Sequence, residues 1–563
     1  MKPTHLLYAL AALVLLCAGC SALAPTASPS PAPTLTATVI QAVATASPAP
    51  AATLPPPAPA TPAPPPSETP LWPARLHVDP NGLWGLQLPA AFGRIDKLDG
   101  SLTRLTGSQH GALVAIDSYQ GDAGSAGNTG EGLRNRARDA VATLYGQGVT
   151  ETAIVEPQLY PWQTGLTFTT ASGAAGEALY MQPGRDEGDY RVYGFVLSYE
   201  APREAAVRPM LEAMRDTFKP ATALPLEAPA GSEPLWAIFS TGLRAFNPTL
   251  PCQHWLAIYS RNGDTWQQRA QMAMEIADYA GAGSVRQVPI EPGHIWLAVD
   301  GGAGAHGGAF ELISYAGNAL TSEVQSSSSS PGAASVEDVD GDGTLDVVLN
   351  QTDNYVFCYA CSVRYPQYQV LRWDGARFVE VRLAALPTSA PEALRGAVNR
   401  AVTLAQAGLW KTARAAADLA PPSQDATATW DVALIRLHAE AFAELAREGA
   451  YPLLNQAFYG DYAAALNVVR PYTPAQIFDP AGPLIAGTPA EGSVGALAGW
   501  LARVTTQALT AQPDLAAAYY LRGWAAYLAE PGSTQALADV EHAAQLAPGE
   551  PLFAQTAAWL RER

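Results

Sequence analysis

The chain has 563 residues and a formal net charge of −18, from 33 basic and 51 acidic side chains. This acidic balance argues against binding to a nucleic-acid backbone or docking on anionic lipid, so no nucleic-acid partner is expected. The length predicts several domains, and five cysteines are few for a disulfide scaffold.

The N-terminus predicts an export signal over residues 1–20. Lys2 gives a basic start, residues 6–16 are apolar but too short for a stable membrane span, and small residues precede Cys20. The run Leu16-Cys-Ala-Gly-Cys20 resembles the bacterial lipobox, whose last cysteine is lipidated. Cys17 departs from that pattern, because an aliphatic residue is usual there, so ordinary signal cleavage or an uncleaved anchor are the alternatives. The resemblance implies an extracytoplasmic protein held on the bacterial membrane through lipidated Cys20.

Residues 21–70 consist mainly of alanine, proline, threonine and serine. Such a segment cannot bury enough apolar surface to offset the entropy of ordering. It is predicted to be a disordered tether with a reach on the order of 150 Å.

Residues 71–220 are predicted to form an α+β domain, and the Pro/Ala-rich residues 221–231 a linker. Residues 203–218 have the apolar spacing of a closing amphipathic helix. The order of strands, a helix, antiparallel strands and this closing helix resembles the Mog1/PsbP fold. The expected strands are residues 83–88, 112–119, 165–170, 178–182 and 190–199, and the first helix is 132–145.

Residues 232–386 are predicted to form a mostly-β domain with three strand-turn-strand units. Their turns are Asn262-Gly-Asp264, Ala316-Gly-Asn318 and Asp374-Gly-Ala376, of which the first and third have the composition of tight hairpins. Three units are too few for a closed propeller, so a small sandwich or a partial, propeller-like sheet is expected. The expected strands are residues 255–259, 295–299, 310–315, 346–350 and 369–373.

The run Asp338-Val-Asp-Gly-Asp-Gly-Thr-Leu-Asp346 predicts a calcium loop. Asp338, Asp340, Asp342 and Asp346 stand at positions 1, 3, 5 and 9, and Thr344 offers its carbonyl at position 7. Position 12 is a leucine in a β-branched run, which favours a strand over the helix of an EF-hand. A strand-flanked loop of this kind resembles the FG-GAP and VCBS repeats. That resemblance covers residues 336–381 and implies structural calcium; a solvated acidic turn is the alternative.

Cys358 and Cys361 are separated by two residues, which predicts a local disulfide in an extracytoplasmic protein. A redox pair and a zinc site completed by Cys252 and His254 are the alternatives. The glycine-rich residues 301–308 lack the end of a phosphate loop and are predicted to form an ordinary loop. The run of serines at residues 326–330 is predicted to be a flexible loop.

Residues 387–563 switch to alanine- and leucine-rich helices. Residues 512–560 resemble a tetratricopeptide repeat, with a first helix through Gly523 and a second through Val540. Two degenerate copies follow the turns at Gly408 and Gly460, but their spacing is much longer than in that family. A generic helical bundle is the alternative, and either version usually binds a protein or peptide.

These features together predict a non-enzymatic envelope lipoprotein that binds or scaffolds a partner through its helices. One alternative is a hydrolase of an envelope polymer, with His306 or the zinc set as its centre. No serine nucleophile elbow or His-Glu-x-x-His motif supports it. The other alternative is a carbohydrate-binding surface protein that uses exposed Trp and Tyr side chains of the β domain.

Overall fold

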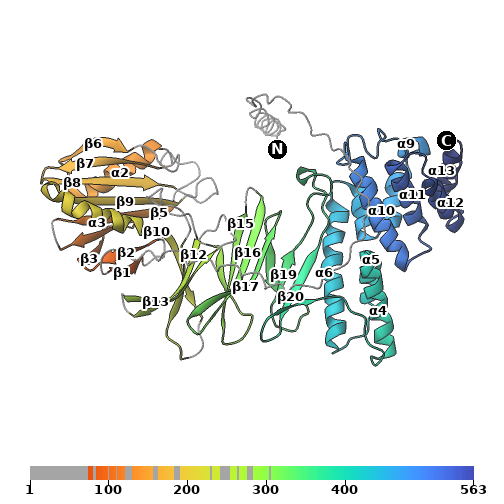
Figure 1. The fold of residues 1–563 in the computed structure, drawn as a ribbon, viewed down its shortest axis with the longest axis horizontal. Coiled ribbons are helices and arrows are strands. Elements are labelled where there is room, and N and C mark those ends of the chain that lie inside the picture. Colours follow the sequence, from red (N-terminus) through yellow and green to blue (C-terminus); the bar gives the residue numbers. More distant parts are fainter. Residues whose placement is uncertain are drawn as a thin grey trace, which may run out of the picture. The chain divides into compact units, whose positions relative to one another are not determined.

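The structure, a computed structural model, describes residues 74–79, 84–98, 100–108, 111–120, 130–155, 163–182, 191–227, 231–240, 254–262, 265–274, 283–303 and 306–563. Its elements follow the predicted order of an α+β part, a mostly-β part and an all-helical part (Figure 1). The signal, Cys20 and the tether lie outside the described residues. Among the described residues, no helix combines the length and apolar character needed to cross a membrane.

The first part is a seven-stranded antiparallel sheet with a helix on each face. Val192 and Val196 of β9 pack with helix α2, whereas Phe195 and Leu197 point to the opposite face and pack with α3. The central strand is therefore buried on both sides, as its near-continuous apolar sequence requires. The strand order is β3 (Phe92–Lys97), β4 (Leu102–Gly107), β5 (Leu113–Gln120), β9 (Arg191–Glu200), β8 (Ala174–Met181), β7 (Gln163–Thr170) and β6 (Val149–Val155), with α2 at Gly130–Tyr145 and α3 at Glu204–Asp216.

A six-stranded sheet crosses the boundary where the sequence predicted a linker. Residues 221–226 belong to strand β10 (Lys219–Leu226), so the linker prediction is wrong for these residues. β10 pairs with β11 from Ala221 to Leu226 and with β2 only at Lys219 and Pro220, so Pro225 lies where only β11 pairs with the strand. The sheet order is β1 (Ala74–Val78), β2 (Trp84–Pro89), β10, β11 (Leu235–Ser240), β12 (His254–Asn262) and β13 (Thr265–Met274).

Two further sheets are four-stranded antiparallel meanders, in which each strand pairs with the next one in sequence. Strands β10 to β13 have the same arrangement, which agrees with the propeller-like alternative. Gly317 and Asn318 have φ of 56° and 64°, so the second predicted turn is also a tight hairpin turn. The meanders are β14 (Val285–Val288), β15 (Ile295–Ala303), β16 (Gly307–Ala316) and β17 (Ala319–Ser328), then β18 (Ala334–Glu337), β19 (Asp346–Asn350), β20 (Tyr368–Trp373) and β21 (Phe378–Val381).

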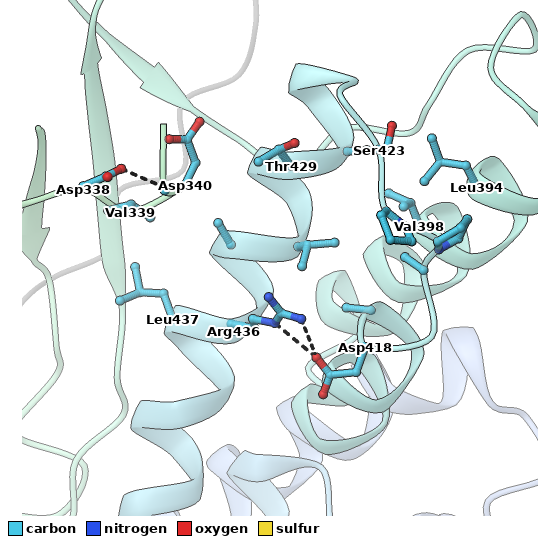
Figure 2. Close-up of a pocket in the computed structure, with 18 of the residues that line it drawn as sticks. Asp338, Val339, Asp340, Leu394, Val398, Asp418, Ser423, Thr429, Arg436 and Leu437 are labelled. Carbon is cyan, nitrogen blue, oxygen red and sulfur yellow. Dashed lines mark hydrogen bonds and ion pairs between the residues drawn. The ribbon is translucent and has the colours of Figure 1, made fainter. Parts of the chain in front are cut away.

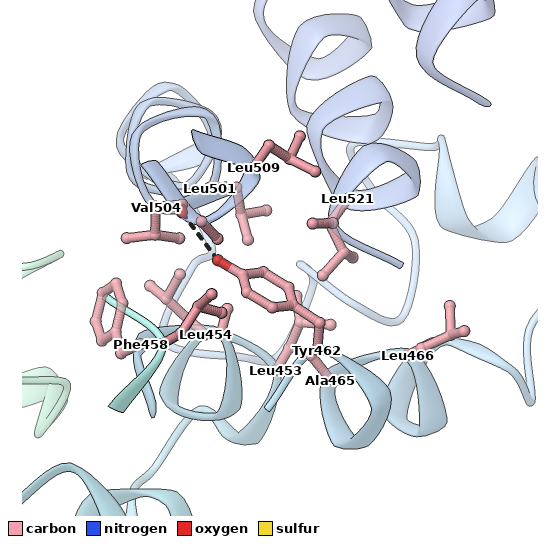
Figure 3. Close-up of a cluster of buried hydrophobic side chains, with 14 of the residues drawn as sticks. Leu453, Leu454, Phe458, Tyr462, Ala465, Leu466, Leu501, Val504, Leu509 and Leu521 are labelled. Atoms are coloured by element: carbon pink, nitrogen blue, oxygen red, sulfur yellow. Dashed lines mark hydrogen bonds between the residues drawn. The ribbon is translucent and has the colours of Figure 1, made fainter. Parts of the chain in front are cut away.

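The rest of the chain is helical, and the two predicted repeat turns touch each other. Gly460 has a φ of 77°, and a Cβ added there would lie 2.6 Å from the Cα of Leu409. Figure 3 shows the core beside this contact, where Tyr462 donates a hydrogen bond of 2.9 Å to the carbonyl of Val504. The helices are α4 (Glu392–Gln406), α5 (Trp410–Ala417), α6 (Ala426–Glu448), α7 (Pro452–Tyr459), α8 (Tyr462–Val469), α9 (Pro474–Ile477), α10 (Val494–Ala511), α11 (Ala516–Ala529), α12 (Thr534–Leu546) and α13 (Pro551–Arg561).

The last sheet packs directly on the first helices. Val348 of β19 and Val370 of β20 share a buried cluster with Trp430 and Leu434 of α6. Beyond β19, the ring of Tyr365 contacts aromatic rings of three helices at centroid distances of 4.9 to 5.2 Å. The acidic loop between β18 and β19 is therefore held close to the helical part of the chain.

Candidate metal centre

The acidic loop connects two antiparallel strands, as the sequence predicted. Glu337, at the end of β18, pairs with Asp346, at the start of β19. Leu349, at position 12 of the loop pattern, lies in β19 and is 6% exposed within the sheet core. A helical EF-hand is therefore excluded.

Three of the four predicted carboxylates come together. Asp338, Asp340 and Asp346 each place a carboxylate oxygen within 4.8 Å of the other two. Calcium binds oxygens at about 2.4 Å, so two oxygens on one ion are at most about 4.8 Å apart. The three side chains supply the hard oxygen donors that calcium prefers, and their spacing fits a shared ion.

Backbone amides fix the shape of the loop. Asp338 accepts hydrogen bonds from the amides of Gly341, Asp342 and Gly343 at 2.8, 3.1 and 2.9 Å. Gly341 and Gly343 have φ of 78° and 90°, a conformation that side chains other than glycine rarely adopt. These contacts curl the backbone around Asp338 and hold its carboxylate in place.

The electrostatics of the cluster favour a cation. Burial, with smaller contributions from the carboxylates of Asp340 and Asp342, raises the pKa of Asp346 to about 7. Burial and its acidic neighbours also raise the pKa of Asp340. Asp346 is 1% exposed, so its charge has little access to water. A divalent ion would offset the cost of keeping these carboxylates ionised.

Asp342 lies differently from its predicted place among the calcium ligands. Asp342 is not part of the close carboxylate group, and its carboxylate lies 3.6 Å from the guanidinium of Arg372. That guanidinium also lies over the ring of Trp430 in α6, 5.7 Å from its centroid. The amide of Thr344 donates to Asp342 at 2.7 Å. Arg372 therefore connects the loop to the helices, a role that no sequence motif indicated.

A pocket of about 640 Å³ lies between the loop and helices α4 to α6. Figure 2 shows Asp338 and Asp340 on one side of it, with Leu437 of α6 near them, whereas Arg436 of α6 points toward Asp418. Arg436 donates to Asp418 at 2.9 and 3.1 Å, which leaves an apolar surface around Leu394 and Val398. No sequence motif indicated this pocket, because its walls are far apart along the chain.

The cysteines settle one of the alternatives. Cys358 and Cys361 form a disulfide, as predicted, so their sulfurs are not available as thiolate ligands for the alternative zinc site. Cys252 lies outside the described residues. His254 is 7% exposed in β12 and stacks on Phe239, with the ring centroids 5.8 Å apart.

His306, the other candidate centre of a hydrolase, lies at the end of the β15–β16 hairpin. Its exposed ring stacks on Tyr359 with centroids 5.2 Å apart. In the described part of the chain, the only group of three or more His, Cys, Asp or Glu side chains placed to share a metal is the aspartate cluster. Among the described residues, His306 therefore does not belong to a group of three or more metal-ligating side chains.

No family model matches the chain, and a search of curated proteins finds none that is similar to it.

Proposed function

We propose that the chain is a non-enzymatic envelope protein with a binding or scaffolding role, in which structural calcium holds the acidic loop against the helices. The single observation that supports calcium is the convergence of the Asp338, Asp340 and Asp346 carboxylates within 4.8 Å of one another. Calcium bound there would neutralise charge and hold the β18–β19 connection rigid, and it would take part in no reaction.

The partner is proposed to be a protein or peptide that binds the helical part. A hollow of about 660 Å³ over α10 and α11 supports this proposal. It is lined mainly by glycine and alanine, including Gly495 and Gly499, and such small residues let a peptide backbone approach closely.

Calcium binding tests the proposal directly. Isothermal titration of the full chain, purified without metal, is expected to show one calcium per chain. Asp340→Asn is expected to weaken the affinity by about tenfold or more, because a ligand charge is lost while the side chain keeps its size.

Asp374→Asn provides the matched control. Asp374 lies in another glycine turn and accepts hydrogen bonds from Ala376 and Arg377, outside the aspartate cluster. Its replacement should leave the calcium affinity unchanged. The structural calcium site would be contradicted if the parent protein bound no calcium, or if Asp340→Asn and Asp374→Asn lost calcium affinity equally. Stoichiometric zinc in the purified protein would point instead to metal chemistry.

Membrane anchoring is proposed to depend on Cys20. In bacteria fed an alkyne-labelled fatty acid, the parent protein should carry the label and sediment with membranes, and Cys20→Ala should lose both properties. Cys17→Ala is the matched control and should retain both. Fatty-acid label on the Cys20→Ala variant would rule out the proposed anchor.

A further inference from the structure

Three aromatic side chains form a cluster beside the β19–β20 connection, in which His306 and Tyr355 are exposed and Tyr359 is partly buried. The rings of His306 and Tyr359 stack with centroids 5.2 Å apart and an interplanar angle of 23°. Tyr355 lies beside Tyr359 at 5.6 Å and is 60% exposed, although tyrosines usually bury much of their ring. We call His306, Tyr355 and Tyr359 the aromatic platform.

The segment between β19 and β20, which carries the two tyrosines, is fixed by buried side chains and a disulfide. Val356 and Val363 are 3% and 0% exposed, because they enter the core of the helical part. The Cys358–Cys361 disulfide closes the short turn that carries Tyr359. A ligand that binds these rings would therefore need to order little of the chain, which favours affinity.

The glycine-rich hairpin end brings His306 to the tyrosines. At Gly308, an added Cβ would lie 2.8 Å from the carbonyl oxygen of Ser330, so only glycine lets the serine run approach the hairpin this closely. Ser329 accepts a hydrogen bond of 2.8 Å from the side-chain amide of Asn354, the residue that precedes Tyr355. The serine-rich segment is therefore bonded to the buried residue before Tyr355, and the Ser329 hydroxyl stays partly exposed.

This combination fits a sugar. The C–H groups on one face of a pyranose ring carry partial positive charge and pack on the negative face of an aromatic ring. Its hydroxyl groups exchange hydrogen bonds with neutral hydroxyl side chains, such as that of the partly exposed Ser329. The net charge of −18 disfavours an anionic polymer. Three side chains can also bury much less surface area than the roughly 800 Å² per partner of a stable protein–protein interface.

We infer that the aromatic platform is a binding site for a neutral glycan, with Tyr355 and Tyr359 stacking on successive sugar faces. This site requires neither calcium nor a partner on the helices, so it stands independently of the function proposed above. The glycan contact would give the protein a second attachment in the cell envelope, separate from the anchor at Cys20.

Native electrophoresis of the full chain in gels containing hydroxyethyl cellulose or galactomannan tests the inference. Migration of the parent protein should be retarded by at least one of these neutral polysaccharides. Tyr355→Ala should raise the dissociation constant by about tenfold, while Tyr355→Phe keeps the ring and most of the affinity. Leu419→Ala is the control for general surface hydrophobicity, because Leu419 is 82% exposed in the helical part.

The folding of each variant is checked by its melting temperature, which should not change because Tyr355 is exposed. Equal retardation of the parent and Tyr355→Ala, or no retardation in either gel, would overturn the inference. A parent dimer that Tyr355→Ala abolishes, without retention on glycan, would likewise overturn it by assigning the platform to protein contact.

Discussion

Calcium at 100 times its dissociation constant is expected to raise the free energy of unfolding by about 2.7 kcal/mol, provided that the unfolded chain does not bind it. The loop lies against β19 and, through Arg372, against Trp430 of α6. The added stability should therefore appear at the contact between sheet and helices. Thermal unfolding in calcium and in chelator measures the total effect, and hydrogen exchange of residues 334–350 and α6 locates it.

Asp346→Asn should change the free energy of unfolding in opposite directions with and without calcium. In calcium, the variant loses a charged ligand and should be less stable than the parent. In chelator, it no longer buries a carboxylate beside Asp338 and Asp340, so it should be at least as stable as the parent. Asp374→Asn, outside the cluster, should respond to calcium like the parent. A loss of stability by Asp346→Asn that is equal with and without calcium would indicate a purely structural aspartate.

Gly460→Ala is expected to destabilise the helical part by about 2–5 kcal/mol. The residue has a φ of 77°, which costs an L-residue about 1–2 kcal/mol. The new Cβ would also lie 2.6 Å from the Cα of Leu409 and 2.9 Å from the carbonyl oxygen of Gly408, and relieving such overpacking typically costs a further 1–3 kcal/mol. The two turns would have to move apart, which would disturb the ion pair of Lys411 with Asp461 beside them.

Urea denaturation followed by circular dichroism at a helical wavelength measures this loss. Gly396→Ala is the matched control, because Gly396 lies inside α4 with no atom within 4 Å of an added Cβ. That change should stabilise the helix by roughly 0.5–1 kcal/mol. Similar unfolding midpoints for the two variants would show that the two turns can move apart at little cost in stability.

The sequence predicted elements whose signal is local. Alternation and turn residues indicated β5, β9 and β16, and helical spacing indicated α3, α11 and α12. The sequence missed β6, whose residues Thr150 to Ile154 are exposed and lack a clear apolar alternation. It also assigned residues 221–226 to a linker, because proline and alanine dominate there. Only the distant pairing of β10 with β2 and β11 shows that these residues form a strand.

The candidate metal centre was predictable in its ligands but not in its surroundings. The spacing of the aspartates identifies the loop, since position in such loops determines which side chains converge. It does not show that Asp342 turns toward Arg372, because that arginine follows 30 residues later, in a strand with no motif of its own. The aromatic platform was unpredictable for the same reason, since His306 and Tyr359 meet only through tertiary contacts.

The pairing of β2 with β10 has a consequence for the order in which the chain can fold. The amide of Gln87 in β2 donates a hydrogen bond to Thr217, 130 residues later, just before β10. At a synthesis rate of 5–20 residues per second, roughly 7–26 s separate the emergence of the two partners. During that interval the β1–β2 hairpin exposes Trp84 and an unpaired strand edge, which makes it vulnerable to wrong pairing and proteolysis. The start of the folded region, although it is made first, thus waits for residues 217–220 before it can reach its final hydrogen bonds.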